Sequence, residues 1–162
     1  MIEIDIQNED DYAIDEEALR RAAITVLTQH QRTEHHALTI VLTDDDTVAE
    51  LNTTYRSIPA PTDVLSFPAE PMPAEIAGDV VYLGDLIIAH TYTAAQAMRE
   101  GHAIDDTLSL LVVHGTLHLL GYDHDTPENR ATMWAAQGSA LTTLGIPTNI
   151  VPALEDSPHK DD

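Results

Sequence analysis

The stretch HGTLHLLGYDH, residues 114–124, decides the organisation that we expect for the whole chain. An apolar run at residues 108–113 precedes it and indicates a helix that is buried rather than lying at the surface. Residues four apart share one face of a helix, so His114 and His118 are expected to project side by side. The sequence therefore predicts a central helix that carries a histidine pair near its end.

Gly121 is the expected end of that helix, because glycine adopts a left-handed terminal conformation at little cost. The chain can then reverse and bring His124 toward His114 and His118. Three imidazoles around one point, with a fourth position open to water, describe a catalytic zinc site rather than a closed structural one. We therefore predict that these three histidines bind one zinc ion per chain.

The same HxxxHxxGxxH spacing occurs in metzincin proteases, which carry a glutamate general base directly after the first histidine. Here that position is Gly115. A metallopeptidase is therefore kept as an alternative function, although this chain lacks the glutamate that would serve as its general base.

Composition limits the other possibilities. The chain has 162 residues, which is most simply one domain, and it has no cysteine for disulfides or thiolate ligands. The acidic residues number 28 against 7 basic ones, for a formal net charge of -21. Such a charge by itself argues against nucleic-acid binding, and we prefer adaptation to a high-salt cytoplasm over general solubility as its cause.

Without a long apolar run or a basic leader, no membrane association is expected, and the predicted location is cytoplasmic.

Period-two and helical patterns along the chain, without βαβ regularity, predict an α+β fold. We expect it to have a small mixed four-stranded sheet packed with about five helices. We expect residues 1–152 to form a single catalytic metallohydrolase domain and the acidic residues 153–162 to be a disordered tail. The predicted strands are 2–6, 37–43, 64–67 and 85–89, with 78–81 as a hairpin partner or loop and 69–77 as an exposed loop. The predicted helices start after Asp15, cover 48–55 and 92–100, contain 108–120, and run from Thr126 to before Gly145.

Three helix starts have capping residues. Asp15 and Thr126 are expected to cap the helices that follow them, the second with proline at its first position. The acidic cluster at residues 44–46 is interpreted as a helix start rather than a metal site.

Four motifs in this order, LNTTYR, PTDVLSFP, GDLIIA and HGTLHLLGYDH, resemble the YbeY family of bacterial rRNA-maturation endoribonucleases. The resemblance covers roughly residues 40–145. It implies a single α+β domain, zinc held by three histidines, and a single-strand-specific endoribonuclease that acts in small-subunit rRNA 3′-end maturation and ribosome quality control. The expected partners are then single-stranded RNA, rRNA and the small ribosomal subunit, and no DNA.

Other candidate site residues surround the histidines. The resemblance matches Arg56 to the arginine that the family has near its metal, and a guanidinium can hold a phosphate through two parallel hydrogen bonds. Asp123 and Asp125 flank His124, and either can orient an imidazole or assist proton transfer, although Asp125 can equally occupy a turn. No general base is assigned. A third possible function is a ribosome-associated binding protein with a structural metal, which a fourth protein ligand would favour.

Overall fold

The computed structural model describes residues 2–32, 34–58, 62–70, 73, 78 and 80–150. Within these residues it has four strands and five helices. The strands are β1 (Ile2–Gln7), β2 (His36–Thr43), β3 (Val64–Pro68) and β4 (Val81–Ala89). The helices are α1 (Glu16–Gln29), α2 (Asp45–Arg56), α4 (His90–Glu100), α5 (Ile104–Leu119) and α6 (Pro127–Leu144).

The four strands form one mixed sheet in the order β1-β2-β4-β3. Strands β1, β2 and β4 are parallel, whereas β3 runs antiparallel to β4. The helix α1 connects β1 to β2, which a parallel pair requires because its connection must return along the whole strand. The predicted α+β fold with a small mixed sheet is confirmed.

One strand is longer than predicted. We expected a strand at residues 85–89, but β4 begins at Val81, where it pairs with His36 of β2. The pairing shifts register between Ala37 and Thr39, so β4 has a bulge in its first half. Most of the loop predicted at residues 69–77, and the whole tail predicted at 153–162, lie outside the described residues.

The two predicted caps, Asp15 and Thr126, are confirmed, and a helix starts at the acidic cluster of residues 44–46 as expected. The side chain of Asp15 accepts a hydrogen bond from the Ala18 amide, and Asp44 accepts one from the Thr47 amide. Thr126 accepts one from the Asn129 amide. Each bond satisfies a backbone N–H that the first helical turn leaves without a partner.

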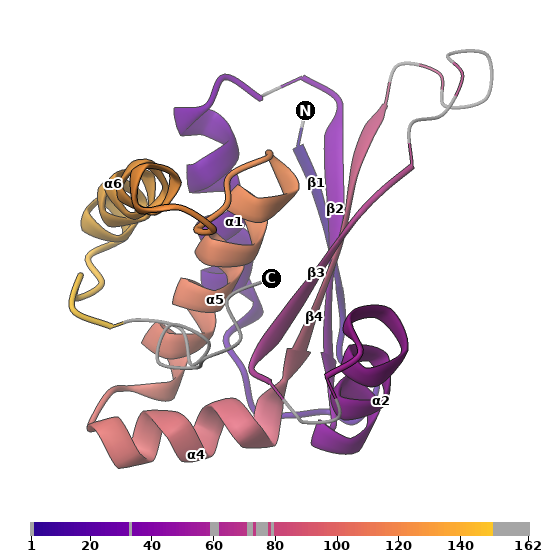
Figure 1. Ribbon diagram of the computed structural model, residues 1–162, viewed down its shortest axis with the longest axis vertical. Coiled ribbons are helices and arrows are strands. Elements are labelled where there is room, and N and C mark those ends of the chain that lie inside the picture. Colours follow the sequence, from indigo (N-terminus) through magenta and orange to yellow (C-terminus); the bar gives the residue numbers. More distant parts are fainter. Residues whose placement is uncertain are drawn as a thin grey trace.

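Helices cover the sheet unequally (Figure 1). The helices α1, α5 and α6 lie on one side of the sheet and α2 lies on the other, while α4 lies beyond the end of β4. The main hydrophobic core is on the α1, α5 and α6 side, and a smaller cluster of Val48, Leu65 and Ala89 lies under α2. Helix α5 is at the centre of the main core, and every residue from Thr107 to Leu117 is buried. In the described part of the chain, no helix is both long enough and apolar enough to cross a membrane.

Gly84 provides a test of the β4 geometry. It has a φ of +141°, and a Cβ added to it would lie 2.2 Å from the backbone oxygen of Phe67. Gly84→Ala should lower the free energy of unfolding by about 2–4 kcal/mol, because neither the strain nor the backbone clash can relax cheaply. Gly138→Ala is the matched control: no atom lies within 4 Å of the added Cβ in α6, and the change should stabilise the helix by about 0.5–1 kcal/mol. Urea unfolding measures the free energy of unfolding of both variants. Similar changes in Gly84→Ala and Gly138→Ala would contradict the strained conformation of Gly84.

Candidate metal centre

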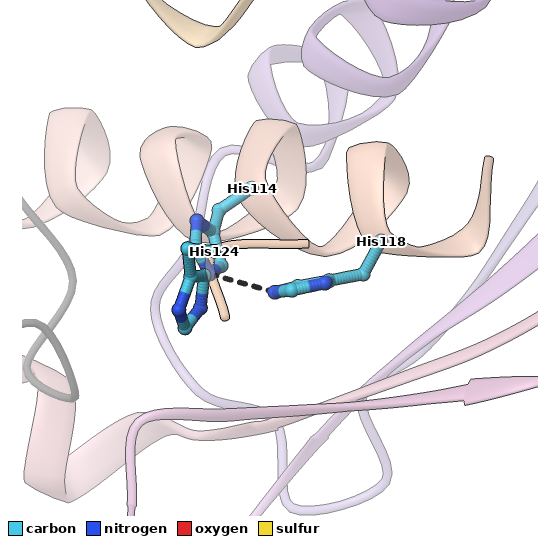
Figure 2. Close-up of side chains that lie close together, drawn as sticks. All are labelled: His114, His118 and His124. Atoms are coloured by element: carbon cyan, nitrogen blue, oxygen red, sulfur yellow. Dashed lines mark hydrogen bonds between the residues drawn. The ribbon is translucent and has the colours of Figure 1, made fainter. Parts of the chain in front are cut away.

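The end of α5 and the segment after it bring three histidines together (Figure 2). His114 and His118 lie one turn apart on α5, and His124 returns from the loop before α6. One nitrogen from each ring lies within 4.8 Å of the others. The Nε2 atoms of His114 and His118 are 3.1 Å apart. His114 and His124 are buried, and His118 is half-buried.

Gly115 lies where α5 packs against β3 and β4. A Cβ at this position would be 2.7 Å from Cδ2 of Leu86 and 3.2 Å from Oγ of Ser66. Leu86 is fully buried, so it has little space into which to move. A side chain at this position would therefore require Leu86 to move.

Hydrogen bonds fix how the two helix histidines face the cluster. Nδ1 of His118 is 2.9 Å from the backbone oxygen of Tyr122. A carbonyl oxygen only accepts hydrogen bonds, so this Nδ1 must carry the hydrogen and Nε2 of the neutral ring has a lone pair. Nδ1 of His114 is 3.0 Å from Oε1 of Gln137 on α6, which favours the same tautomer. Two lone pairs that face each other are well suited to bind a cation between them.

The carbonyl that orients His118 is itself held in place. The hydroxyl group of Tyr122 is 3.0 Å from Nε2 of His30, the residue that follows α1. Nδ1 of His30 donates to the backbone oxygen of Val26 at 2.8 Å. The end of α1 thus supports the loop from which His124 returns.

Burial keeps the helix histidines uncharged. It lowers the pKa of His118 to about 4, with smaller lowering effects from His124 and Arg56, against raising effects from the Tyr122 backbone and Asp123. Burial also lowers the pKa of His114 well below its usual value, and the neighbouring His118 adds to this effect. Both rings are therefore neutral at pH 7, the state in which imidazole binds metals.

Arg56 is the last residue of α2 and is close enough to the cluster to influence the pKa of His118. It borders a hollow of about 540 Å³ together with Tyr55, Ser57 and Phe67. Arg56 precedes His114 by 58 residues in the sequence, and the fold brings it near the histidine cluster.

The two aspartates that flank His124 have different surroundings. Oδ1 of Asp123 accepts a hydrogen bond from the His124 amide at 2.8 Å, and the Asp123 charge raises the pKa of His118. Oδ1 of Asp125 accepts from Nδ2 of Asn129 at 2.8 Å, and this bond lowers the pKa of Asp125. Asp123 is thus associated with the histidine cluster, whereas Asp125 interacts with the first turn of α6.

Two contributors to the site were not among the residues that we predicted. Gln137 and the Tyr122 carbonyl orient His114 and His118. The available signal for Gln137 was its position: it is an uncharged polar residue on the buried face of α6 that also contains Met133, Ala140 and Leu141. The sequence gives no sign of which histidine such a residue would contact.

Taken together, the fold and the site define a small α+β domain with a three-histidine cluster that can hold one metal ion. A family model described as Endoribonuclease YbeY matches residues 4–145. The chain belongs to the YbeY family.

Curated relatives named Endoribonuclease YbeY support this assignment. The relative from Moorella thermoacetica is 46% identical over 115 residues, covering 67% of this chain and 73% of its own. The relative from Acetivibrio thermocellus is 36% identical over 162 residues, covering 91% of this chain and all of its own (100%). A solution structure of a Thermotoga maritima protein has the same fold, with a TM-score of 0.56 and 22% identity, over 98% of this chain and 99% of that one.

The histidine pKa values predict how the stability of the metal-free protein depends on pH. The folded-state pKa of His118 is about 4, below its ordinary value of 6.5, so the unfolded state binds more protons between these values. The free energy of unfolding should therefore fall as the pH is lowered from about 6.5 to about 4, and His118→Gln should reduce that dependence. Urea unfolding of chelator-treated protein across this range measures it. Equal pH dependence in the wild type and the variant would contradict the assigned pKa of His118.

Proposed function

We propose that the protein is a zinc-dependent endoribonuclease that cleaves single-stranded RNA. The observation that carries the proposal is the cluster of His114, His118 and His124, two of them neutral and oriented through Nδ1, close to the charge of Arg56. Membership in the YbeY endoribonuclease family supports the reaction class.

The donor set fits zinc. Three neutral imidazole nitrogens suit this ion, and His114 and His118 each present Nε2 while Nδ1 is held by Gln137 or the Tyr122 carbonyl. Bound here, zinc would supply a water of lowered pKa and polarise a phosphoryl oxygen. Among the described residues, the cluster that can hold a metal has three members, which leaves a position for water and disfavours a closed structural site.

The protein side chains have distinct roles in this proposal. Arg56 holds the phosphate through parallel hydrogen bonds and stabilises the charge that develops on its oxygens. Asp123 lies beside His124 and favours the charged form of His118, so it contributes negative potential at the ligands. Asp125 holds the first turn of α6 through Asn129, and that turn follows directly after His124.

The biological substrate is proposed from the four motifs shared with the family. We assign the activity to the maturation of the small-subunit rRNA 3′ end and to ribosome quality control, with rRNA and the small subunit as cytoplasmic partners. Residues 1–152 are proposed to form the catalytic domain. The metallopeptidase alternative is disfavoured because Gly115 occupies the position at which metzincin proteases carry the glutamate base.

Zinc content is the first test. The wild type should bind about one zinc per chain, and His118→Ala should lose stoichiometric binding because two imidazoles make a weak site. Gln137→Leu should weaken zinc binding by about 10–100-fold, since it removes the partner that orients His114. Elemental analysis and competition with a chelator measure these effects, with His102→Ala, a histidine between α4 and α5, as the control. Full zinc retention by His118→Ala would rule out the assigned ligands.

The second test separates Arg56 from the metal. Arg56→Ala should keep its zinc and fold but slow cleavage of single-stranded RNA by about 10²–10³-fold, as loss of a charge-stabilising donor does. Arg56→Lys should restore only part of the rate, because an ammonium group lacks the planar two-point contact.

Single-turnover cleavage and zinc content are measured on the same samples. Arg99→Ala, which removes an exposed arginine from α4, is the charge-matched control and should cleave normally. Unchanged cleavage by Arg56→Ala at full zinc occupancy would refute the phosphate role. An absence of cleavage by the zinc-loaded wild type on every RNA offered would refute the proposed function itself.

A further inference from the structure

A second hollow opens beside the histidine cluster. Its volume is about 470 Å³, within the range of small-ligand sites. The residues that border it are His124, Asp125, Thr126, Pro127, Arg130, Ala131 and Trp134. The first three precede α6, and the last four belong to its N-terminal part. Because His124 borders both the hollow and the cluster, a ligand that fills the hollow lies next to the metal centre.

Trp134 is the aromatic surface of this hollow. Its ring centroid is 5.7 Å from that of His124 and 5.8 Å from that of His114, and it is nearly perpendicular to both rings. The ring is half-buried and also packs against the main core. These contacts hold the ring in place, so a ligand that stacks on it would cost little additional ordering.

A cation lies against the same ring. Arg130 is exposed and lies one helical turn before Trp134, with its guanidinium carbon 5.6 Å from the indole centroid. The whole chain has 7 Lys and Arg and a single Trp. One of these few cations thus pairs with the only tryptophan of the chain, beside the metal centre. Asp125 borders the same hollow, and its carboxylate accepts a hydrogen bond from Asn129. The hollow therefore offers a guanidinium and an indole ring together to a ligand that is both aromatic and anionic.

Unpaired nucleotides have this chemistry. A nucleobase stacks on aromatic rings and on the guanidinium plane of arginine, and the adjoining phosphate is attracted by the same guanidinium. We propose that this hollow binds one unpaired base of the RNA, next to the phosphodiester at the metal centre, with Trp134 and Arg130 as the stacking surface. The proposal rests on the proposed endoribonuclease function and gives a physical reason for its preference for single strands: a base in a duplex is stacked on its neighbours and cannot enter the hollow.

The experiment uses Trp134 as its own reporter, because it is the only tryptophan in the chain. The zinc-loaded wild type is titrated with a short single-stranded 2′-O-methyl RNA, and the oligonucleotide is checked on a gel to be intact afterwards. Fluorescence should be quenched on binding, and a duplex of the same sequence should not quench it. An abasic residue is then moved along the oligonucleotide one position at a time. At one position, it should abolish most of the quenching and weaken binding by roughly 5–150-fold, as loss of one stacked base does.

Substitutions of Trp134 and Arg130 test the contribution of each side chain to RNA binding. Trp134→Leu should weaken RNA binding by a similar factor and lose the sensitivity to the abasic residue, whereas Trp134→Phe should retain part of both. Arg130→Ala should weaken binding, while Arg99→Ala, with the same change in net charge, should not. Affinities are measured by anisotropy of a labelled oligonucleotide, with zinc content and thermal midpoint taken on the same samples. The abasic series on the wild type needs no variant, so it decides the question even if Trp134→Leu fails to fold.

The outcomes separate this inference from the proposed function. If quenching depends on one base but the unmodified RNA is not cleaved, base binding in the hollow is supported and the endoribonuclease function is refuted. Two results would refute base binding in the hollow while leaving the endoribonuclease function intact, provided that cleavage is normal. One is unchanged fluorescence at saturating RNA, and the other is an abasic series in which no position is sensitive. Quenching by peptides but not by RNA would also overturn the inference.

Discussion

The burial of α5 is the constraint on which the rest of the structure depends. Its apolar residues hold together α1, α6 and the sheet, and the same helix carries His114 and His118 into that core. A polar ring in such a place requires a hydrogen-bond partner, because an unsatisfied buried group costs free energy. Gln137 and the Tyr122 carbonyl are those partners. The orientation of the two histidine rings therefore follows from the hydrogen bonds that these buried polar groups require.

Local features of the site were predictable from the sequence, and distant ones were not. The pairing of His114 with His118 follows from helical periodicity, and caps such as Asp15 depend on residues three positions away. Gln137 is 23 residues from His114, and its partner depends on how α6 crosses α5. The first half of β4 was missed for a similar reason: its strand character comes from pairing with β2 through a bulge, which the apolar pattern does not encode.

The net charge of the whole chain is a poor guide to the protonation state of the histidine cluster. Many of the acidic residues serve local structure at helix starts: Asp15 and Asp44 are N-caps, and the first turns of α1, α2 and α5 each contain two more acidic residues. There they interact with the positive end of the helix. At His118, burial lowers the pKa more than any charge does, the His124 charge adds to it, and Asp123 raises the pKa more than Arg56 lowers it. Burial, rather than the net charge of the chain, therefore decides that this ring is neutral.

Two hollows lie beside residues of the proposed site and have similar linings. Arg56 shares its hollow with Tyr55, which is 66% exposed and meets Phe67 edge to face, while Arg130 and Trp134 border the second hollow beside His124. Each hollow thus combines a guanidinium with an aromatic ring. On the proposed function, a flexible strand can place its phosphate at the metal and still contact both hollows, whereas a duplex keeps its bases stacked. The selection of single strands would then arise from the shape around the metal rather than from the metal itself.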